Sequence, residues 1–231
     1  MARILYDLAG ADPQRRFSPY CWRTKLALAH KGLSFETVPW RFTEKDVIAF
    51  SGQGRVPVLV DGERTIFDSW TIANYLEDAY PGTPSLFGGA GGRAASRTLN
   101  NWADIVLTPA IARVVLVDIF ERIHEKDRAY FRESREQRFG AKLEDVVADR
   151  DGNIKALRQA LDPVRATLKA QPYLGGDAPL YCDYIVFGHL QWARCISPIP
   201  LLDAGDPVCA WRERLLDAHD GFARKCPAYT A

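Results

Sequence analysis

Strand-like patterns in this 231-residue chain are confined to the residues before Asp68. Four short apolar runs have the length and composition of strands, at Ile4–Leu8, Leu33–Val38, Val58–Val60 and Thr65–Phe67. The dipeptide Asp61-Gly62 between the last two runs is a strong signal for a tight hairpin. Helical periodicity predicts a helix after Ser18, a short polar helix after Thr43 and a helix capped by Ser69. In the first of these helices Arg23 and Lys25 lie off the apolar stripe. The first 80 residues therefore have the predicted order β-α-β-α-β-β-α.

The segment Tyr80–Gly92 has the composition of a flexible connection, because it holds two prolines and five glycines. Beyond it the strand patterns disappear. An apolar stripe from Leu99 to Val117 follows one helical face, and Pro109 predicts a kink in it. Further helices are expected over 153–170 and 183–195, with a very polar helix between 125 and 148. We predict two domains, residues 1–80 and residues 93–231, of which the second is all-helical.

Composition limits the kinds of partner that the chain can have. Hydrophobic residues make up 47% of the chain, enough for a sizeable core. Lys and Arg total 30 against 29 Asp and Glu, without a long basic run, so we expect no binding to nucleic acid or membrane. No apolar stretch approaches the roughly 20 residues of a membrane span, and no secretory signal is recognisable. These features predict a cytoplasmic protein with a small-molecule partner.

The cysteines and histidines form no metal-binding or disulfide pattern. Five cysteines are scattered through the chain, at Cys21, Cys182, Cys195, Cys209 and Cys226. Their odd number and wide spacing fit neither a disulfide framework nor a zinc site, and indicate a reducing compartment. The four histidines lie in no HxxxH or HxxE pattern, so no metal is expected.

The stretch FSPYCWRTK places a hydroxyl and a thiol at the start of the first predicted helix. Pro19 suits the first helical position, which makes Ser18 the expected N-cap. A helix N-terminus and a hydroxyl hydrogen bond both favour a thiolate over a thiol. Ser18 can therefore hold the sulfur of a bound thiol compound. Direct participation of Cys21 and a purely structural cap are the alternatives.

Three ordered motifs resemble the glutathione transferase superfamily: SPYC before the first helix, RVPVLVDG at the third strand, and DSWTIANYL at the third helix. The segments SPYCWRTKLALAHKG, DSWTIANYLEDAYPGTPSLF and SREQRFGAKLEDVVADR are similar to the bacterial glutathione-dependent β-aryl etherases and their fungal relatives. The resemblance implies an α/β thioredoxin-like N-terminal domain (βαβαββα) followed by an all-α C-terminal domain, the glutathione transferase fold. It implies glutathione as the co-substrate and Ser18 as the catalytic residue.

Five residues are expected to bind glutathione: Arg41, Arg55, Val56, Asp68 and Ser69. The cysteinyl amide of the tripeptide can pair with the backbone of Val56 where the resemblance implies a cis bond to Pro57. The helix N-terminus at Ser69 can receive the γ-glutamyl carboxylate, while Asp68 accepts from its amine. Arg41 and Arg55 are candidates for the glycyl carboxylate. The residues alone leave open a trans proline, a Ser69 that only caps the helix, and solvated arginines.

An acceptor pocket is expected opposite the glutathione sulfur, lined by Phe17 and by Trp102, Val106 and Ala110 on one helical face. Such apolar and aromatic walls favour a bulky aromatic electrophile, as in the cleavage of β-aryl ethers. A homodimer is expected from the resemblance. The alternatives are a glutathione-binding or interaction protein with little catalysis, and a thiol-dependent reductase of glutathione adducts that uses Cys21.

Asp183 opens a segment, DYIVFGHL, that resembles the capping segment in the family's helical domain. The Ser or Thr usual three positions earlier is replaced by Leu180. This difference leaves the capping interaction open.

Overall fold

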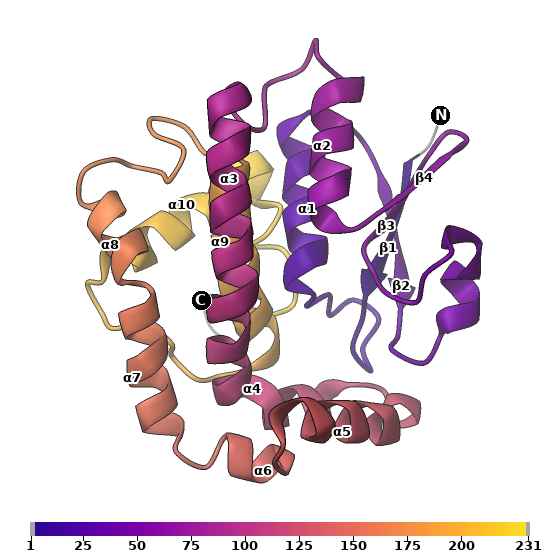
Figure 1. Cartoon of the computed structure of the whole chain (residues 1–231), viewed down its shortest axis with the longest axis vertical. Helices are drawn as coiled ribbons and strands as arrows, with labels where there is room; N and C mark the ends of the chain where they lie inside the picture. Colours follow the sequence, from indigo (N-terminus) through magenta and orange to yellow (C-terminus); the bar gives the residue numbers. More distant parts are fainter. Residues whose placement is uncertain (1–2, 230–231) are drawn as a thin grey trace.

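A mixed four-stranded sheet forms the centre of the first part of the chain (Figure 1). The computed structural model describes residues 3–229. Its strands are β1 (Arg3–Leu8), β2 (Glu36–Trp40), β3 (Val58–Asp61) and β4 (Arg64–Phe67). They lie in the order β2-β1-β3-β4, with β1 parallel to β2 and the other neighbours antiparallel. The predicted order β-α-β-α-β-β-α is confirmed, although β2 begins three residues later than predicted.

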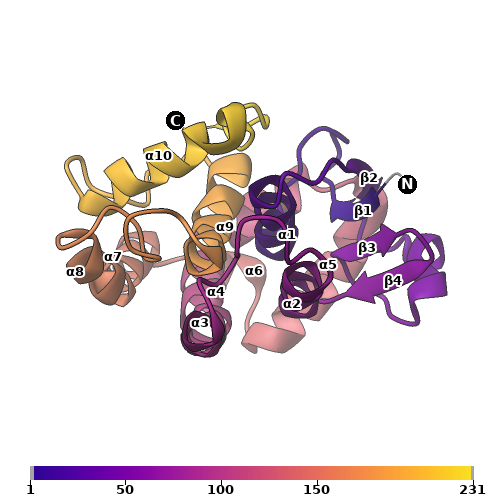
Figure 2. The same ribbon diagram turned by 90° about the horizontal axis from the view of Figure 1, so that it is seen from above.

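Helices α1 (Pro19–His30) and α2 (Ser69–Ala79) lie between the sheet and the helical part of the chain (Figure 2). Gly32, with φ 65°, follows the last turn of α1, as the sequence predicts for a helix stop. The short 3-10 helix η1 (Lys45–Ser51) contacts the sheet, with the Phe50 ring 5.4 Å from the ring of Tyr6. The sheet is therefore covered by a pair of long helices and by one short turn.

Helix α1 is buried on nearly all sides, which its apolar periodicity does not predict. Arg23 and Lys25 lie off the apolar stripe, yet they are 0% and 3% exposed. Arg23 donates to Asn100 Oδ1 at 2.9 Å and to Asp104 Oδ1 at 2.8 Å, and Lys25 Nζ lies 2.8 Å from Asp7 Oδ2. Each buried cation has an opposite charge beside it, which offsets the cost of removing it from water.

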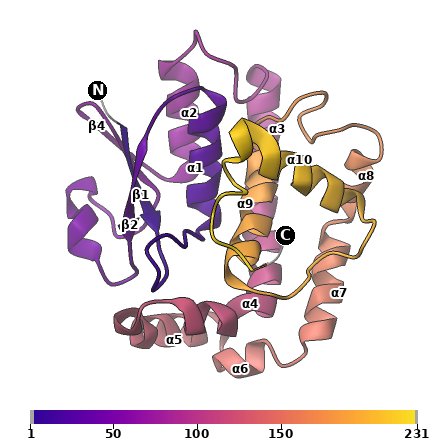
Figure 3. The same ribbon diagram turned by 180° about the vertical axis from the view of Figure 1, so that it is seen from behind.

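The rest of the described chain is helical. Its elements are α3 (Ala90–Trp102), the π-helical turn η2 (Ala103–Leu107), α4 (Thr108–Arg122), α5 (Glu125–Phe139), α6 (Leu143–Val146), α7 (Arg150–Ala160), α8 (Asp162–Leu168), α9 (Tyr181–Ile196) and α10 (Pro207–Gly221). Figure 3 shows α9 enclosed between α1, α10 and the α3–α4 pair. All but one of the residues of α9 are buried, so this helix forms the core of the second part.

Three predicted helices are interrupted in the structure. The irregularity predicted at Pro109 occurs as η2, just before that proline, because Pro109 suits the first turn of α4. Gly140, with φ 66°, ends α5 within the polar segment. The segment 153–170 divides at Leu161, and α8 begins with Asp162 and Pro163. No helix within residues 3–229 is long and apolar enough to cross a membrane.

Helices α1 and α9 join the two parts at close range. A Cβ atom at Gly188 of α9 would lie 2.5 Å from the carbonyl oxygen of Pro19, so only glycine allows this approach. The Tyr181 hydroxyl at the start of α9 donates to the carbonyl of Ser69 at 2.9 Å. The first turns of both α1 and α2 are thus positioned by the helical part of the chain.

Candidate active site

The strand directions bring the predicted site residues to one edge of the sheet. The carboxyl ends of the parallel strands β1 and β2 lie side by side, because Leu8 pairs with Trp40. Ser18 follows β1 through a short loop that folds back, with the Phe17 amide donating to the Leu8 carbonyl at 3.3 Å. Arg41 directly follows β2. The residues after both strands therefore lie at the same edge.

The antiparallel strands contribute the remaining predicted residues to this edge. Val58 at the start of β3 pairs with Phe67 at the end of β4, and also with Tyr6 of β1. Val56 precedes β3 and Asp68 follows β4, so both lie next to this pairing. Four chain segments, far apart in sequence, therefore meet where α1 and α2 begin (Figure 1).

Ser18 is the N-cap of α1, as the sequence predicts. Its backbone is extended, with φ −63° and ψ 125°, and its Oγ accepts a hydrogen bond from the Cys21 amide at 3.2 Å. The side chain is 4% exposed. Within residues 3–229, the Ser18 hydroxyl donates to no carboxylate or carbonyl oxygen. The contacts of this hydroxyl are with the amide and the thiol of Cys21, so no oxygen acceptor of the described residues holds its proton back from a sulfur bound at the start of α1.

Cys21 has the properties of a structural residue. Its side chain is 0% exposed. Burial, and then the negative charge of Asp7, raise the pKa of the Cys21 thiol well above its usual value. A buried thiol that resists ionisation is a poor nucleophile. The arrangement favours Ser18 over Cys21 as the group that faces a bound thiol compound.

The Val56–Pro57 peptide bond is cis, as the family resemblance implied. Val56 lies outside the β3–β4 ladder, which begins at Val58. Within residues 3–229, the main chain of Val56 has no hydrogen-bond partner. An extended peptide can therefore pair with the N–H and C=O groups at this position.

Asp68 is the N-cap of α2, which corrects the prediction that Ser69 caps this helix. Its Oδ1 accepts hydrogen bonds from the Thr71 amide at 2.9 Å and the Thr71 hydroxyl at 3.2 Å. Asp68 has φ 69°, a costly conformation for a residue other than glycine. Strain of this kind is typical of functional sites. Ser69 becomes the first helical residue and is 2% exposed.

The two predicted arginines differ in their surroundings. Arg41 is engaged within its own loop, with Nε 3.3 Å from the Gly10 carbonyl and Nη1 3.5 Å from Glu44 Oε1. Arg55 is exposed, and its guanidinium has no ion-pair partner within residues 3–229. Arg55 is the freer of the two to receive a ligand carboxylate.

The predicted acceptor-pocket residues come from two parts of the chain. Phe17 is buried beside Phe42, with ring centroids 6.4 Å apart. On the helical side Val106 is exposed, whereas Trp102 and Ala110 are half-buried. Val106 belongs to the π-helical turn η2, and turns of this kind often occur at functional sites. Within residues 3–229, Phe17 makes no ring contact or hydrogen bond with Trp102, Val106 or Ala110.

The comparisons with known proteins agree with this architecture. The sequence model of the glutathione S-transferase N-terminal domain matches residues 17–79, and that of the C-terminal domain matches residues 94–200. The chain belongs to the glutathione S-transferase superfamily. Over 206 residues it is 25% identical to a probable glutathione S-transferase, GSTU6, of Oryza sativa, covering 85% of this chain and 80% of the relative. The corresponding values for glutathione S-transferase 4 of Zea mays are 27%, 86% and 83%.

Solved structures of fungal glutathione transferases share the fold. Glutathione transferase GSTFuA3 of Phanerochaete chrysosporium superimposes with a TM-score of 0.77 and 25% identity, covering 97% of this chain and 94% of that one. A glutathione S-transferase of Ceriporiopsis subvermispora, solved in complex with glutathione, has a TM-score of 0.78 and 23% identity, with the same coverage. The predicted fold class is therefore confirmed.

In this glutathione S-transferase superfamily member, helix α5 contributes side chains to the site that the sequence did not predict. The buried Asp127 accepts hydrogen bonds from the Phe42 and Thr43 amides, at 3.2 Å and 3.0 Å, and so fixes the loop after β2. The charged composition of the segment did not predict this contact. The one feature that could have suggested it is the acidic residue in the first turn of α5.

Arg135 of α5 is a second unpredicted residue near the site. Its guanidinium lies 4.9 Å from the Phe42 ring centroid and 4.5 Å from that of Phe131. Burial, and then the positive charge of Arg138, lower the pKa of Arg135 to about 10, and Arg55 contributes in the same direction. The charge of Arg55, in the first part of the chain, therefore acts on Arg135 of α5.

Within residues 3–229, no group of three or more His, Cys, Asp or Glu side chains is arranged to hold a metal ion.

Proposed function

We propose that this glutathione S-transferase superfamily member binds glutathione at the sheet edge formed by residues 1–80 and activates its thiol at Ser18. The single observation that carries the proposal is the Ser18 N-cap, whose hydroxyl proton is directed to no internal carboxylate or carbonyl. A thiolate beside this hydroxyl would also lie at the N-terminus of α1. Both a hydroxyl donor and a helix N-terminus favour the charged sulfur, so the thiol ionises at a lower pH.

The remaining parts of glutathione would use the other segments of the edge. The main chain of Val56 would pair with the cysteinyl residue of the tripeptide, because the cis bond before β3 leaves this segment outside the ladder. The N-terminus of α2 at Ser69 would receive the γ-glutamyl carboxylate, and Asp68 would accept from the α-amine. Arg55, or Arg41, would bind the glycyl carboxylate.

We propose a hydrophobic aromatic electrophile as the second substrate, held by residues of the helical domain, 93–231, with Phe17 opposite. In an ether cleavage the glutathione thiolate attacks the carbon that bears the ether oxygen. A carbon–sulfur bond forms, the carbon–oxygen bond breaks, and the aryloxide leaves with the electron pair. The exposed Val106 and the aromatic Trp102 and Phe17 support an apolar pocket, which would orient a flat ring for in-line attack.

Steady-state kinetics test this proposal. Purified protein is assayed with glutathione and a chloroaromatic compound, a guaiacyl β-aryl ether or a small epoxide, and its binding to immobilised glutathione is measured in parallel. Turnover of the two aryl substrates supports the proposal in full. Turnover of the epoxide alone would contradict the proposed aromatic substrate but would still support a transferase activity. Binding without turnover of any substrate would indicate a glutathione-binding protein instead.

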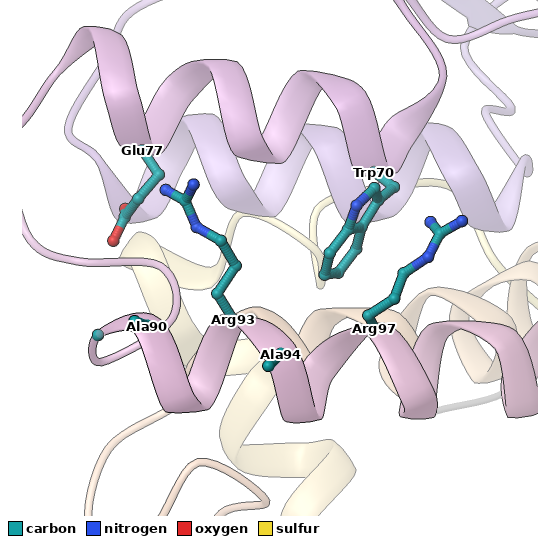
Figure 4. Close-up of a pocket in the computed structure, with 7 residues that line it drawn as sticks. Trp70, Glu77, Ala90, Arg93, Ala94 and Arg97 are labelled. Carbon is teal, nitrogen blue, oxygen red and sulfur yellow. The ribbon is translucent and has the colours of Figure 1, made fainter.

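We also propose that the chain forms a homodimer in the cytoplasm. A groove of about 420 Å³ lies between α2 and α3, lined by Trp70, Glu77, Arg93 and Arg97 with three small residues (Figure 4). None of the predicted site residues lines it. The guanidinium of Arg97 lies 5.1 Å from the Trp70 ring centroid. A second copy could cover this surface by pairing its first domain with the helical domain of its partner.

Sedimentation at micromolar concentration tests the dimer. The expected species has twice the 25.9 kDa mass of the chain. Trp70→Ala should shift the equilibrium toward the monomer, because an aromatic side chain at the centre of an interface carries much of its binding energy. A wild-type protein that sediments only at 25.9 kDa would contradict the proposal.

A further inference from the structure

Two cysteine side chains meet where the end of the chain crosses helix α9. Cys195 Sγ and Cys226 Sγ lie 3.7 Å apart, although 31 positions separate the residues in sequence. Cys195 belongs to α9 and is 0% exposed, whereas Cys226 follows α10 and is half-buried. Both are free thiols. This pair therefore combines the sulfur of a half-buried residue with that of a fully buried one.

The segment that carries Cys226 is held in place by non-covalent contacts. The Phe222 ring packs 6.0 Å from that of Trp22. The Gln191 side chain of α9 donates to the Ala223 carbonyl at 2.9 Å, and the Tyr229 amide donates to the Arg194 carbonyl at 3.0 Å. These contacts place Cys226 over α9 without a covalent link, so a disulfide could be added without refolding the segment.

The surroundings of the pair connect it to the loop before Ser18. Cys226 Sγ lies 3.7 Å from the Arg16 carbonyl, and Arg15 donates to the Cys195 carbonyl at 2.5 Å. The buried Lys25 adds positive charge on the same side. The hydrogen bond from Cys195, together with Lys25, lowers the pKa of Cys226 to about 6 against the effect of burial. Cys226 is thus the sulfur of the pair that ionises more readily.

We propose that Cys226 and Cys195 form a reactive dithiol that is oxidised by glutathione disulfide to an intramolecular disulfide. In the first step the Cys226 thiolate attacks one sulfur of glutathione disulfide. The disulfide bond of the reagent breaks, one glutathione leaves, and Cys226 carries the other in a mixed disulfide. In the second step Cys195 attacks the Cys226 sulfur and expels the second glutathione. The hydrogen bond to Cys226 is the largest cause that raises the pKa of Cys195, ahead of burial, and it is lost once Cys226 is no longer a thiolate.

The electron and proton balance of this sequence is complete. The protein dithiol loses two electrons and glutathione disulfide gains them. The two thiol protons end on the two glutathione molecules released. The product fastens the C-terminal segment to α9 and against the loop from Arg15 to Arg16 that leads to Ser18. This redox site is separate from the proposed transferase site, and it does not depend on glutathione binding at Ser18.

The experiment treats the reduced wild-type chain with glutathione disulfide in the absence of oxygen, and quenches it with acid. Peptide mass mapping without reductant should give a Cys195–Cys226 cross-link. Cys209 is the internal control, because it is half-buried and its Sγ contacts the Asp203 carbonyl rather than another cysteine. It should gain only a glutathionyl group. Failure to form the cross-link in folded wild-type protein would overturn the proposal.

Two variants distinguish the two exchange steps from each other and the dithiol from the proposed transferase site. Cys195→Ser should retain glutathione on Cys226, because the second step needs the Cys195 thiol. Ser18→Ala should form the cross-link at the wild-type rate, because the dithiol reacts outside the transferase site. If wild-type protein keeps the glutathionyl group on Cys226 and forms no cross-link, the proposed role of Cys195 is contradicted. A rate that falls with Ser18→Ala would contradict the independence of the two sites.

Discussion

The carboxylate of Asp7 lies 2.8 Å from Nζ of Lys25, and neither side chain is more than 3% exposed. Asp7 belongs to β1 and Lys25 to α1, so the pair links the sheet to the helix that begins at Ser18. The Asp7 carboxylate makes no hydrogen bond within residues 3–229, and Lys25 is its closest cation. Its buried charge is therefore compensated mainly by Lys25, with Arg16 Nη1 farther away at 3.8 Å from Asp7 Oδ2.

We predict that Lys25→Met lowers the free energy of unfolding by about 3 kcal/mol, because it removes the nearer of the two cations that compensate the buried Asp7 carboxylate. Asp7→Asn combined with Lys25→Met removes both charges and should recover most of this loss. Urea unfolding of the two variants at neutral pH measures the difference. Equal destabilisation in the single and double variants would show that packing, rather than charge, determines the effect.

Asp127 should couple the stability of helix α5 to the loop after β2. We expect Asp127→Ala to cost about 3 kcal/mol, because it leaves the amides of Phe42 and Thr43 without their charged acceptor, which is itself buried. Glu125→Ala is the matched control, since Glu125 is exposed in the same helical turn. Thermal unfolding of both variants checks the prediction. If Glu125→Ala is as unstable as Asp127→Ala, the loss comes from removing an acidic residue at the start of α5 and not from the contact with the loop after β2.

The buried histidines should make the protein less stable in mild acid. Burial, and then the charge of Arg23, lower the pKa of His189 well below its usual value, and burial lowers those of His30 and His219. The unfolded histidines titrate at about 6.5. Below that pH the unfolded chain takes up protons that the folded chain does not, so folding stability falls as the pH falls.

Each fully suppressed histidine should contribute a slope of about 1.4 kcal/mol per pH unit below pH ~6.5. The His189 side chain contacts the Ile185 carbonyl through Nδ1 and the Thr108 hydroxyl through Nε2, at 2.9 Å and 2.7 Å. His189→Gln should be less stable at pH 8 but should show a smaller slope in acid. Urea unfolding over the pH range measures both. If the dependence of stability on pH is unchanged in His189→Gln, His189 does not contribute to the acid destabilisation.

The proposed role of Arg55 can be tested with a truncated ligand. We expect Arg55→Ala to weaken glutathione binding about 10-fold, as for the loss of one charge-assisted hydrogen bond. Binding of γ-glutamylcysteine, which lacks the glycyl carboxylate, should be almost unchanged. Arg64→Ala on the exposed strand β4 is the control. If Arg55→Ala weakens the binding of both ligands equally, Arg55 does not bind the glycyl carboxylate. Arg41→Ala would then be the next variant to measure.

Much of the first part of the chain was predictable because its signals are local. The hairpin predicted at Asp61-Gly62 is present, although its loop is Gly62-Glu63 because Asp61 is the last residue of β3 and pairs with Arg64. The residues at the strand ends meet because strand direction follows from the order of elements. The cap of α2 was misassigned by one residue. Both Asp68 and Ser69 are good capping residues, and only the backbone geometry decides between them.

The parts that were not predictable depend on distant partners. Arg23 and Lys25 were expected off the buried face, but the carboxylates beside them come from η2 and β1. Arg135 enters the site from a segment more than a hundred residues from Ser18 in sequence. The capping role of Asp183 was left open because Leu180 replaces a hydroxyl residue. Its carboxylate nevertheless accepts from the Leu180 amide at 3.0 Å, because this bond needs only the main chain of that residue.

The most direct test of the account is the pH titration of the thiolate absorbance of bound glutathione. In the wild-type protein the thiol pKa should fall about 1–2 units below that of free glutathione, through the Ser18 hydroxyl and the N-terminus of α1. Ser18→Ala should raise it toward the free value and lower turnover about 10-fold, with glutathione affinity within a few-fold of wild type. Cys21→Ser should match the wild type. An identical thiol pKa in the wild-type and Ser18→Ala proteins would contradict the central claim.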